Sequence, residues 1–403
     1  MALDFTKNKK YFIFAIKETL KFISDIPLVV LSYLIPKESN LYVFISHVGD
    51  KFNDNPKYLY FYFKKKGKKV VYICSDKSLL KRLTEKGINA VYSFSLKGIW
   101  TIARAKYIFI THSVKGVSRS LIGGILGNFN IIQTWHGIGF KSIALLDPNS
   151  LLKILQIIIS TKILKVIVGI RFKVILATSD AIKEKFEKAF SSKNVFITGL
   201  PRNDVLFNHS FLFVDYRRDL GLNKFDKVIL YAPTFRERQY AYPFTDDFLE
   251  KLDKWLAEKN YILLVKKHIY DRALKVESNY KRIWDISDKV EDVQELLPHI
   301  DVLISDYSSI ITDFALLRRP IILYIYDLER FIKECRSFYF DPREVFPGPF
   351  AYSQEELIKI LSDMSWFEDS NYKERYEKFL DFFHKYKDGK SCERVEKLLE
   401  EIS

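Results

Sequence analysis

The sequence predicts an α/β protein built from two doubly wound domains in tandem. Its 403 residues exceed what one hydrophobic core usually organises. Two separate series of short apolar runs alternate with stretches of helical character, which is typical of parallel sheets covered by helices. We expect two Rossmann-like domains whose strands direct their carboxyl ends at a central cleft, because that is where ligands bind in such folds.

The first series predicts a domain over residues 37–208. Its expected strands are LYVFIS (41–46), KVVYICS (69–75), AKYIFITHS (105–113), NFNIIQTWHG (128–137), KVILATSD (173–180) and NVFITGL (194–200). The intervening stretches 55–63, 77–86 and 95–104 suit helices or loops.

The second series predicts a domain over residues 209–375. Its expected strands are KVILYAPT (227–234), YILLVKKH (261–268), RIWDIS (282–287), DVLIS (301–305) and PIILYIY (320–326). The last residues, 376–403, continue a helical tail that could cross back to the first domain.

Two apolar segments point to a membrane surface. In residues 1–36 charged residues interrupt the apolar ones, so no stretch approaches the roughly 20 apolar residues of a spanning helix, and no signal-peptide cleavage site follows. This pattern fits either an amphipathic helix in a membrane interface or a helix packed on a core. Residues 149–173 are the most apolar of the chain yet carry five Lys and Arg, and residues 114–127 are similarly basic. Both favour helices on an anionic lipid surface, and a buried helix is the alternative for residues 149–173.

Charge and composition restrict the partners. The formal net charge of +14 favours an anionic partner, but no recognised nucleic-acid-binding module is present. The cysteines Cys74, Cys335 and Cys392 match no pairing motif, which indicates a reducing compartment, the cytoplasm, and no zinc site. There is no Walker loop, dinucleotide fingerprint, nucleophile elbow or metal-binding Asp pair. We therefore expect no cofactor and no metal.

A serine-rich turn follows one strand of the second domain. Between the apolar runs of residues 301–326 stand Ser305, Asp306, Ser308 and Ser309, at the expected start of a helix. The free N–H groups and the dipole of a helix start suit a phosphate, and the serine hydroxyls add donors. Asp306 is expected in a supporting role. An ordinary capped turn is the alternative.

In the first domain, His136 is the main candidate for chemistry. It follows a strand and stands beside Gly137, which allows close approach of a ligand to the backbone. A histidine there can act as a general base near neutral pH, and Lys141 adds a cation. After the last strand of this domain, Arg202 is a further candidate ligand contact.

In the second domain, cations and a hydroxyl follow two strands. Lys266, Lys267 and His268 stand in a row at one strand end, which suits a diphosphate whose charge grows as a bond to phosphorus breaks. Thr234 and Arg236 follow another strand, as a hydroxyl donor and a two-pronged phosphate ligand. A solvated basic loop is the alternative for the first group.

Taken together, these pieces resemble the CDP-glycerol glycerophosphotransferase family, which builds teichoic acids and related polymers. The matching stretches are FNDNPKYLY (52–60), QTWHGIGFKSI (133–143), TGLPRNDVL (198–206), ILYAPTFRE (229–237), SDYSSIITDF (305–314), RPIILYIYDLE (319–329), FYFDPREVFPGP (338–349) and DGKSCERV (388–395). They occur in the family's order across nearly the whole chain.

The resemblance implies a GT-B fold and transfer of glycerol phosphate from CDP-glycerol to a hydroxyl of a lipid-linked acceptor, with release of CMP. It implies an undecaprenyl-diphosphate-linked saccharide as acceptor and a peripheral location on the cytoplasmic face of the membrane. The family's catalytic histidines fall on His136, as general base, and on His268, as stabiliser of the donor phosphates. The family commonly has proline after the second histidine, whereas Ile269 stands here.

Other functions stay open. The absence of a long extra amino-terminal domain favours the priming step, but a poly(glycerol phosphate) or ribitol-phosphate polymerase fits the same motifs. A basic membrane-surface binding protein without catalysis is the non-enzymatic alternative.

Overall fold

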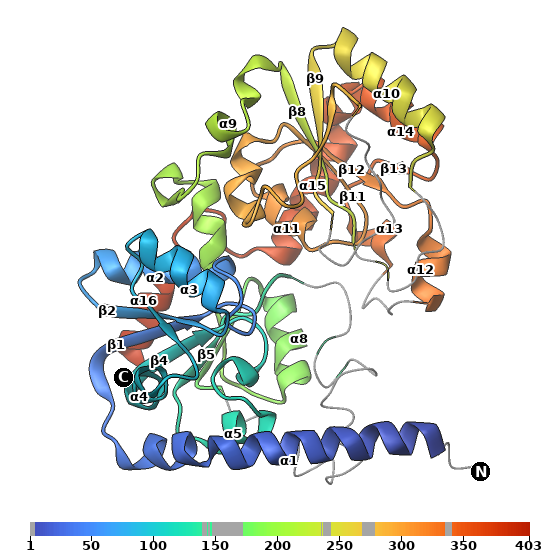
Figure 1. Ribbon diagram of the computed structural model, residues 1–403. Coiled ribbons are helices and arrows are strands. Elements are labelled where there is room, and N and C mark those ends of the chain that lie inside the picture. The colour runs from blue at the N-terminus through green and yellow to red at the C-terminus, as the bar shows by residue number, and fades with distance from the viewer. Residues whose placement is uncertain are drawn as a thin grey trace. The chain divides into compact units, whose positions relative to one another are not determined.

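A computed structural model describes residues 5–138, 143, 146, 172–234, 236, 243–267, 279–334 and 341–403 of the chain. Residue contacts divide the chain into two compact units, each with its own sheet (Figure 1). Unit 1 comprises Met1–His136, Ile143–Asp204 and Lys390–Ser403, and unit 2 comprises Gly137–Ser142 and Val205–Gly389.

The described part of unit 1 forms a seven-stranded sheet in the order β3-β2-β1-β4-β5-β6-β7, with every pairing parallel. The strands are β1 (Glu38–Ile45), β2 (Lys69–Cys74), β3 (Ala90–Tyr92), β4 (Ala105–Ile110), β5 (Ile131–Gln133), β6 (Val174–Ala177) and β7 (Val195–Ile197). All six predicted strands are present, whereas β3 is too short to show a periodicity in the sequence. The strand order reverses between β1 and β4, and doubly wound sheets bind ligands at such a reversal.

Helices cover this sheet. They are α2 (Asp54–Lys65), α3 (Lys77–Glu85), α4 (Leu96–Arg104), α5 (Leu121–Leu126), α8 (Asp180–Phe190) and α16 (Ser391–Glu401), with short 3₁₀ turns η1 (Val114–Gly116) and η3 (Pro201–Leu206). Side chains of Asp76, Ser95 and Ser179 accept backbone N–H bonds and so begin α3, α4 and α8. In the core, the rings of Phe44 and Phe109 stack at 4.8 Å.

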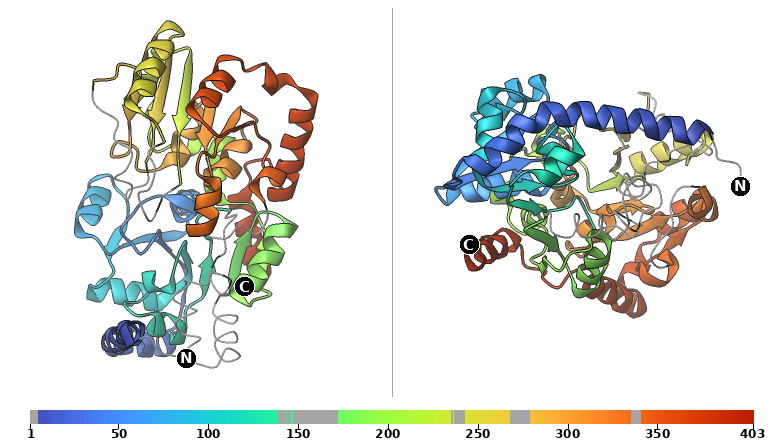
Figure 2. Two further views of the ribbon diagram at one scale, coloured as in Figure 1. Left: turned by 90° about the vertical axis from the view of Figure 1, so that its right-hand side faces the viewer. Right: turned by 90° about the horizontal axis from the view of Figure 1, so that it is seen from below.

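Helix α1 (Phe5–Leu34) packs on unit 1 through polar side chains. It runs along α5 in Figures 1 and 2. The buried residues Glu18, Asp25 and Ser32 are seven positions apart and therefore share one face of the helix. Asp25 accepts hydrogen bonds from the Arg119 N–H and from the N–H and hydroxyl of Ser120.

The contact between α1 and α5 depends on a glycine. A Cβ atom on Gly123 would lie 2.7 Å from the carboxylate of Asp25, so only glycine lets the two helices approach this closely.

None of the helices in the described ranges is both long enough and apolar enough to cross a bilayer.

The described part of unit 2 forms a six-stranded sheet in the order β10-β9-β8-β11-β12-β13, again with parallel pairings. The strands are β8 (Lys227–Tyr231), β9 (Tyr261–Val265), β10 (Ile283–Asp285), β11 (Val302–Ser305), β12 (Ile321–Tyr324) and β13 (Phe350–Ala351). The five predicted strands are present, and β13, with two residues, was not predicted. The order reverses between β8 and β11.

The helices of unit 2 are α9 (Tyr216–Asp219), α10 (Asp246–Glu258), α11 (Ile310–Ala315), α12 (Leu328–Glu334), α13 (Pro342–Val345), α14 (Gln354–Ser362) and α15 (Ser370–Phe383). Short 3₁₀ turns are η4 (His209–Phe211), η5 (Leu222–Lys224), η6 (Val293–Glu295), η7 (Leu297–His299) and η8 (Ser365–Glu368).

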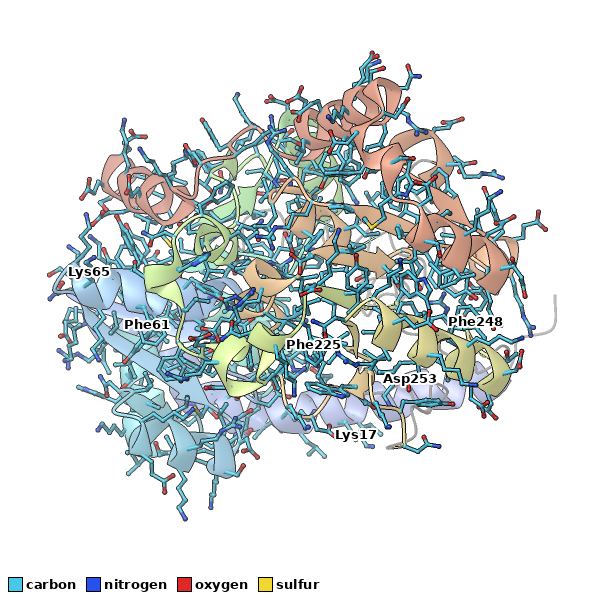
Figure 3. All side chains as sticks on the ribbon, turned by 90° about the horizontal axis from the view of Figure 1, so that it is seen from above. Lys17, Phe61, Lys65, Phe225, Phe248 and Asp253 are labelled. Atoms are coloured by element: carbon cyan, nitrogen blue, oxygen red, sulfur yellow. The ribbon has the colours of Figure 1, made fainter. Side chains whose placement is uncertain are left out.

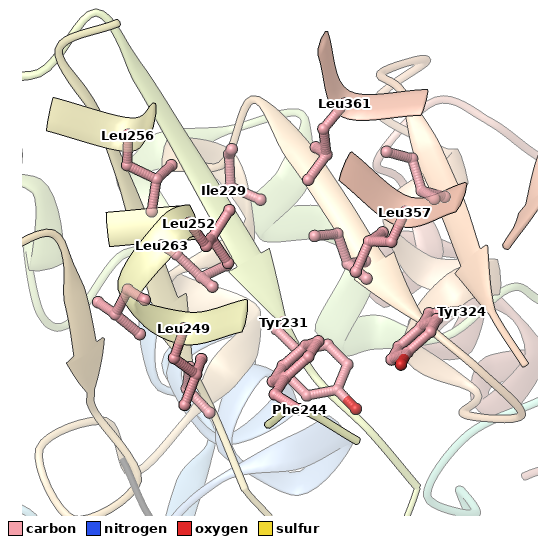
Figure 4. Packing of buried hydrophobic residues seen from close by; sticks show 14 of the residues in the cluster. Ile229, Tyr231, Phe244, Leu249, Leu252, Leu256, Leu263, Tyr324, Leu357 and Leu361 are labelled. Atoms are coloured by element: carbon pink, nitrogen blue, oxygen red, sulfur yellow. The ribbon is translucent and has the colours of Figure 1, made fainter. Parts of the chain in front are cut away.

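Leucines of α10 pack on the unit 2 sheet. Leu249, Leu252 and Leu256 point toward Ile229 of β8 and Leu263 of β9 (Figure 4). These leucines are three or four residues apart, so they form the apolar stripe of an amphipathic helix. Burying each side chain stabilises the fold by about 1.5–3 kcal/mol.

The same helix is tied to β10 by a carboxylate. Asp253 of α10 (Figure 3) accepts hydrogen bonds from the N–H groups of Arg282, at 2.7 Å, and Lys281, at 3.3 Å. This places α10 at the β9–β10 side of the sheet.

The end of the chain belongs to unit 1. Helix α16 begins where the carboxylate of Asp204 accepts the N–H groups of Ser391 and Cys392, each at 2.8 Å. Glu396 of this helix accepts a hydrogen bond from Tyr62 of α2 at 2.6 Å. Asp204 thus anchors the start of a helix that lies far along the chain from it.

Candidate active site

Three histidines converge at the carboxyl edge of the unit 1 sheet. His47 follows β1, His112 follows β4 and His136 follows β5, and these strands are neighbours around the reversal of strand order. The rings of His112 and His136 are stacked with centroids 3.9 Å apart and planes 11° apart. The ring of His47 meets His112 edge-on at 4.6 Å.

Hydrogen bonds orient each imidazole. Nδ1 of His136 lies 3.2 Å from the carbonyl oxygen of Thr111, which can only accept, so Nδ1 carries the proton and Nε2 is the basic nitrogen. The Thr111 hydroxyl accepts the His47 N–H at 2.9 Å and lies 2.7 Å from Nδ1 of His112. Nδ1 of His47 lies 2.7 Å from Asp50.

Burial keeps the central ring neutral. Desolvation strongly lowers the pKa of His112, and the nearby His136, His47 and Lys51 lower it further. The neutral ring shares a hydrogen bond with the Thr111 hydroxyl through Nδ1. His136 therefore stacks on an uncharged partner.

The loop that carries His136 is held by Asn55 and Arg202. Asn55 donates to the carbonyl oxygens of Thr134 and Trp135, at 3.1 and 2.9 Å, and accepts the Arg202 N–H at 3.0 Å. Nη1 of Arg202 donates to the His136 carbonyl oxygen at 2.9 Å and to Asp54 at 3.1 Å. Arg202, predicted as a ligand contact, is thus placed where it positions the backbone of His136.

Unusual backbone conformations gather around the same ring. Trp135 and His47 have positive φ angles of 56° and 54°, which residues other than glycine rarely adopt. Gly137 has φ of 144°. Such conformations cluster at functional sites, where the surrounding structure maintains them.

Sequence reasoning found only one histidine of this group. His47 and His112 each stand within two residues of a predicted strand end, the same signal that singled out His136. Asp50 and Asn55 carried no such signal, since their role depends on partners distant in the chain.

In unit 2, Asp306 and Arg236 form the centre of a buried ionic network. Nη1 of Arg236 lies 2.6 Å from Asp306, and its Nε and Nη2 atoms each lie 2.9 Å from the carboxylate of Asp327. Thr234 donates its N–H to Asp306 at 2.9 Å, and Tyr307 donates both its N–H to Asp306 and its hydroxyl to Asp327.

These contacts decide the charge of Asp306. Burial by itself raises the pKa of this carboxyl, but the Arg236 charge and the hydrogen bonds from Thr234, Arg236 and Tyr307 bring it below its usual value. Asp306 is therefore ionised and paired with Arg236. The Arg236 fork, predicted for phosphate, binds two carboxylates here.

The predicted serines separate into two kinds. Ser305 is buried and donates to the Ala232 carbonyl at 2.7 Å, so it joins β11 to the end of β8. Ser308 and Ser309 are half-exposed at the start of α11, and Ser309 makes no side-chain cap bond. The Thr234 hydroxyl oxygen is buried without a hydrogen-bond partner in the described part of unit 2.

Lys266 and Lys267 contact the segment around β10. Nζ of Lys266 donates to the Ser287 carbonyl at 3.1 Å, and Nζ of Lys267 lies 2.6 Å from Asp285. His268 and Lys141, both predicted site residues, lie outside the described ranges. Within those ranges, no three His, Cys, Asp or Glu side chains are arranged to hold a metal ion.

Comparisons with known proteins agree on one family. The family model described as CDP-glycerol:poly(glycerophosphate) glycerophosphotransferase matches residues 28–401. The chain is 32% identical to a teichoic acid poly(glycerol phosphate) polymerase of Bacillus spizizenii, over 90% of this chain and 92% of that protein. It is 29% identical to a teichoic acid glycerol-phosphate transferase of Staphylococcus aureus, over 96% and 97% of the two chains.

A solved structure has the same fold. The structure of the wall teichoic acid polymerase TagF superimposes with a TM-score of 0.75 and 23% identity, covering 99% of this chain and 98% of that one. The predicted GT-B architecture of two Rossmann-like sheets is thereby confirmed. From its sequence and its fold, the chain belongs to the CDP-glycerol:poly(glycerophosphate) glycerophosphotransferase family and is a transferase of teichoic acid biosynthesis.

Proposed function

We propose that the enzyme transfers glycerol phosphate from CDP-glycerol to a hydroxyl group of an undecaprenyl-diphosphate-linked saccharide, the priming step of teichoic acid synthesis. The histidine group of unit 1 carries this proposal. It presents Nε2 of His136 as a basic nitrogen on a ring held by Thr111 and His112. Family membership sets aside the alternative of a non-catalytic binding protein.

The reaction proceeds by direct displacement at phosphorus. The acceptor oxygen attacks the β-phosphorus, which bears the glycerol, while its proton passes to Nε2 of His136. The bond from that phosphorus to the bridging oxygen breaks, and CMP leaves with the electron pair. The proposed reaction needs no cofactor, because it requires only a base for the acceptor proton and positive groups that neutralise the phosphate charge. Chelation of divalent metals with EDTA is expected to leave the activity in place.

Unit 2 is proposed to hold the donor. Ser308 and Ser309 at the start of α11 can donate to phosphate oxygens, and Thr234 offers a hydroxyl beside Asp306. Lys266 and His268 follow the neighbouring strand β9 and are proposed to neutralise the diphosphate as charge develops.

The acceptor side is proposed to lie on the cytoplasmic face of the membrane, with α1 on the lipid surface. The buried face of this helix is largely polar, with Leu28 as a buried apolar residue, and seven other apolar side chains are 44–74% exposed. These are Ile16, Leu20, Ile23, Ile26, Val30, Tyr33 and Leu34. Lys17 and Lys21 are also exposed, and Lys17 projects from the helix in Figure 3. An apolar stripe edged by lysines suits an anionic bilayer.

Polymerisation is the second candidate. One relative is a poly(glycerol phosphate) polymerase and another a glycerol-phosphate transferase, each matched over nearly its whole length. A ribitol-phosphate polymerase matches over half of this chain. The ratio of CMP released to acceptor consumed, measured with each CDP-polyol, distinguishes these activities.

The test is CMP release by the purified protein from CDP-glycerol, with and without a short-chain lipid-diphosphate disaccharide. Priming predicts release that depends on acceptor and stops near one CMP per acceptor. Release of many CMP molecules per acceptor would establish a polymerase. Release of CMP from CDP-ribitol but not from CDP-glycerol would identify CDP-ribitol as the donor. No release with either donor would refute the proposed activity.

A further inference from the structure

A pocket opens in unit 1 between α1 and the carboxyl edge of the sheet. It is lined by residues of α1, by the segments that follow β1, β2 and β3, and by residues 115–119. Its empty volume is about 430 Å³, including solvent at the open mouth. Its lining includes none of the three histidines and none of the residues of the Arg236 network.

Two cations line this pocket. The Arg119 guanidinium lies 4.5 Å from the centroid of the Phe94 ring, in a cation–π contact. No carboxylate of the described residues lies within ion-pair distance of Arg119. Lys115 lines the same pocket, with Nζ 2.7 Å from Glu18.

The acidic groups nearby are already compensated. Asp25 lines the pocket, but its carboxylate accepts the N–H groups of Arg119 and Ser120 and the Ser120 hydroxyl. Glu18 is buried between Lys115 and Lys21. Lys21, Lys115 and Arg119 outnumber Glu18 and Asp25, so a ligand in the pocket meets a net positive charge.

Hydroxyl donors complete the lining. Ser93, which is 9% exposed, has a buried hydroxyl oxygen with no hydrogen-bond partner in the described part of the chain. Ser75 lines the pocket from the segment after β2. An arginine with serine hydroxyls is a donor set that suits phosphate oxygens.

The position of the pocket relates it to the histidines and to the apolar stripe. Ser24 and Leu28 of α1 form part of its wall, so it adjoins the helix that carries the exposed apolar side chains. Val48 also lines it, and the preceding residue, His47, contacts the ring of His112. The pocket thus lies between a surface for hydrocarbon and the proposed base.

We propose that this pocket binds the phosphate groups of the amphiphilic acceptor, with Arg119 as the principal cation. This inference rests on the proposed function and names the acceptor subsite in unit 1. The apolar chain of the acceptor lies along α1, its phosphates lie against Arg119 and Ser93, and its saccharide extends past Val48 to the histidines.

The test is equilibrium binding of farnesyl diphosphate to the full-length protein, without donor. Farnesol and inorganic pyrophosphate are the companion probes. Farnesol has the apolar chain without the phosphates, and pyrophosphate has the phosphates without the chain. Wild-type protein is expected to bind farnesyl diphosphate more tightly than either. Arg119→Gln is expected to weaken that binding about tenfold or more, because one charge-assisted contact is lost, whereas Arg119→Lys retains part of it.

Arg218→Gln, an exposed arginine of unit 2, is the matched control and is expected to bind like wild type. Equal binding by Arg119→Gln and wild type would overturn the proposal, as would pyrophosphate binding as tight as that of farnesyl diphosphate. CMP release, assayed on the same preparations, separates the two claims. If CMP release depends on acceptor but Arg119→Gln binds farnesyl diphosphate like wild type, only the pocket proposal is refuted. If binding of farnesyl diphosphate depends on Arg119 but no CMP is released, only the proposed activity is refuted.

Discussion

The two sheets carry different chemistry at equivalent places. At the reversal of strand order in unit 1, the side chains are imidazoles, and His112 and His136 stack on each other. At the reversal in unit 2, Arg236 and Asp306 neutralise each other within a buried network. A neutral imidazole can accept a proton, whereas a paired ion maintains geometry. The same edge of the fold thus presents stacked imidazoles in one unit and a buried ion network in the other.

The largest expected effect is on turnover, through the unit 1 base. His136→Ala should lower kcat by about 10²–10⁴-fold, because general-base catalysis contributes that much. The same range is expected for His268→Ala if His268 neutralises the donor phosphates. CMP release measures both. His209→Ala, an exposed histidine of η4, is the control, and a His136→Ala enzyme with wild-type kcat would show that the base lies elsewhere.

Breaking the ionic network of unit 2 should lower the free energy of unfolding. Arg236→Met leaves the buried carboxylates of Asp306 and Asp327 without their cation, and loss of one partner of a buried pair costs about 3–5 kcal/mol. Urea unfolding measures this free energy. Lys251→Ala, which removes an exposed pair with Asp247, should unfold like wild type. Equal unfolding of Arg236→Met and wild type would contradict a supporting role.

A smaller effect on kcat distinguishes positioning from proton transfer in unit 1. His112→Ala removes the ring that stacks on His136 and should lower kcat about tenfold to a hundredfold, since a displaced base loses its alignment. His112→Phe retains a flat ring and should recover much of that loss. KM for CDP-glycerol should stay unchanged in both variants. If His112→Phe were as slow as His136→Ala, His112 would have to transfer a proton itself.

The smallest expected effect is the pH dependence of stability. The pKa of His112 is lowered in the folded state, so the unfolded chain binds the extra proton below its ordinary pKa of about 6.5. Stability should therefore fall as the pH drops below about 6.5, by up to roughly 1.4 kcal/mol per pH unit from this group. Urea unfolding between pH 5 and 8 should show a shallower slope for His112→Phe.

Asp306 should act in a different pH range. Its folded pKa is lowered, so its contribution to stability is present above its ordinary pKa of about 3.9 and is lost as the pH falls through the folded value. Between pH 5 and 8, Asp306→Asn should therefore change the level of stability but not its slope. An altered slope for Asp306→Asn in that range would contradict the assignment of its charge.

Sequence reasoning recovered the strands and their ends because these are local properties. Apolar runs of four to eight residues predicted eleven strands, and the two that were missed, β3 and β13, have three and two residues. His136 was identified because it follows a run and precedes a glycine. His47 and His112 follow runs as well, but nothing in their local sequence shows that β1, β4 and β5 are neighbours.

By itself, then, the sequence determined two parallel sheets, the positions of polar residues at strand ends and the two faces of α1, since each follows from short-range periodicity. Only the tertiary structure decided which of these residues meet. In that structure, His112 stacks on His136, and the Arg236 guanidinium binds Asp327 and Asp306. The polar face of α1 lies inward, where Asp25 accepts hydrogen bonds from Ser120. Such partners lie tens of residues apart in the chain, and strand order and burial, which local patterns do not encode, bring them together.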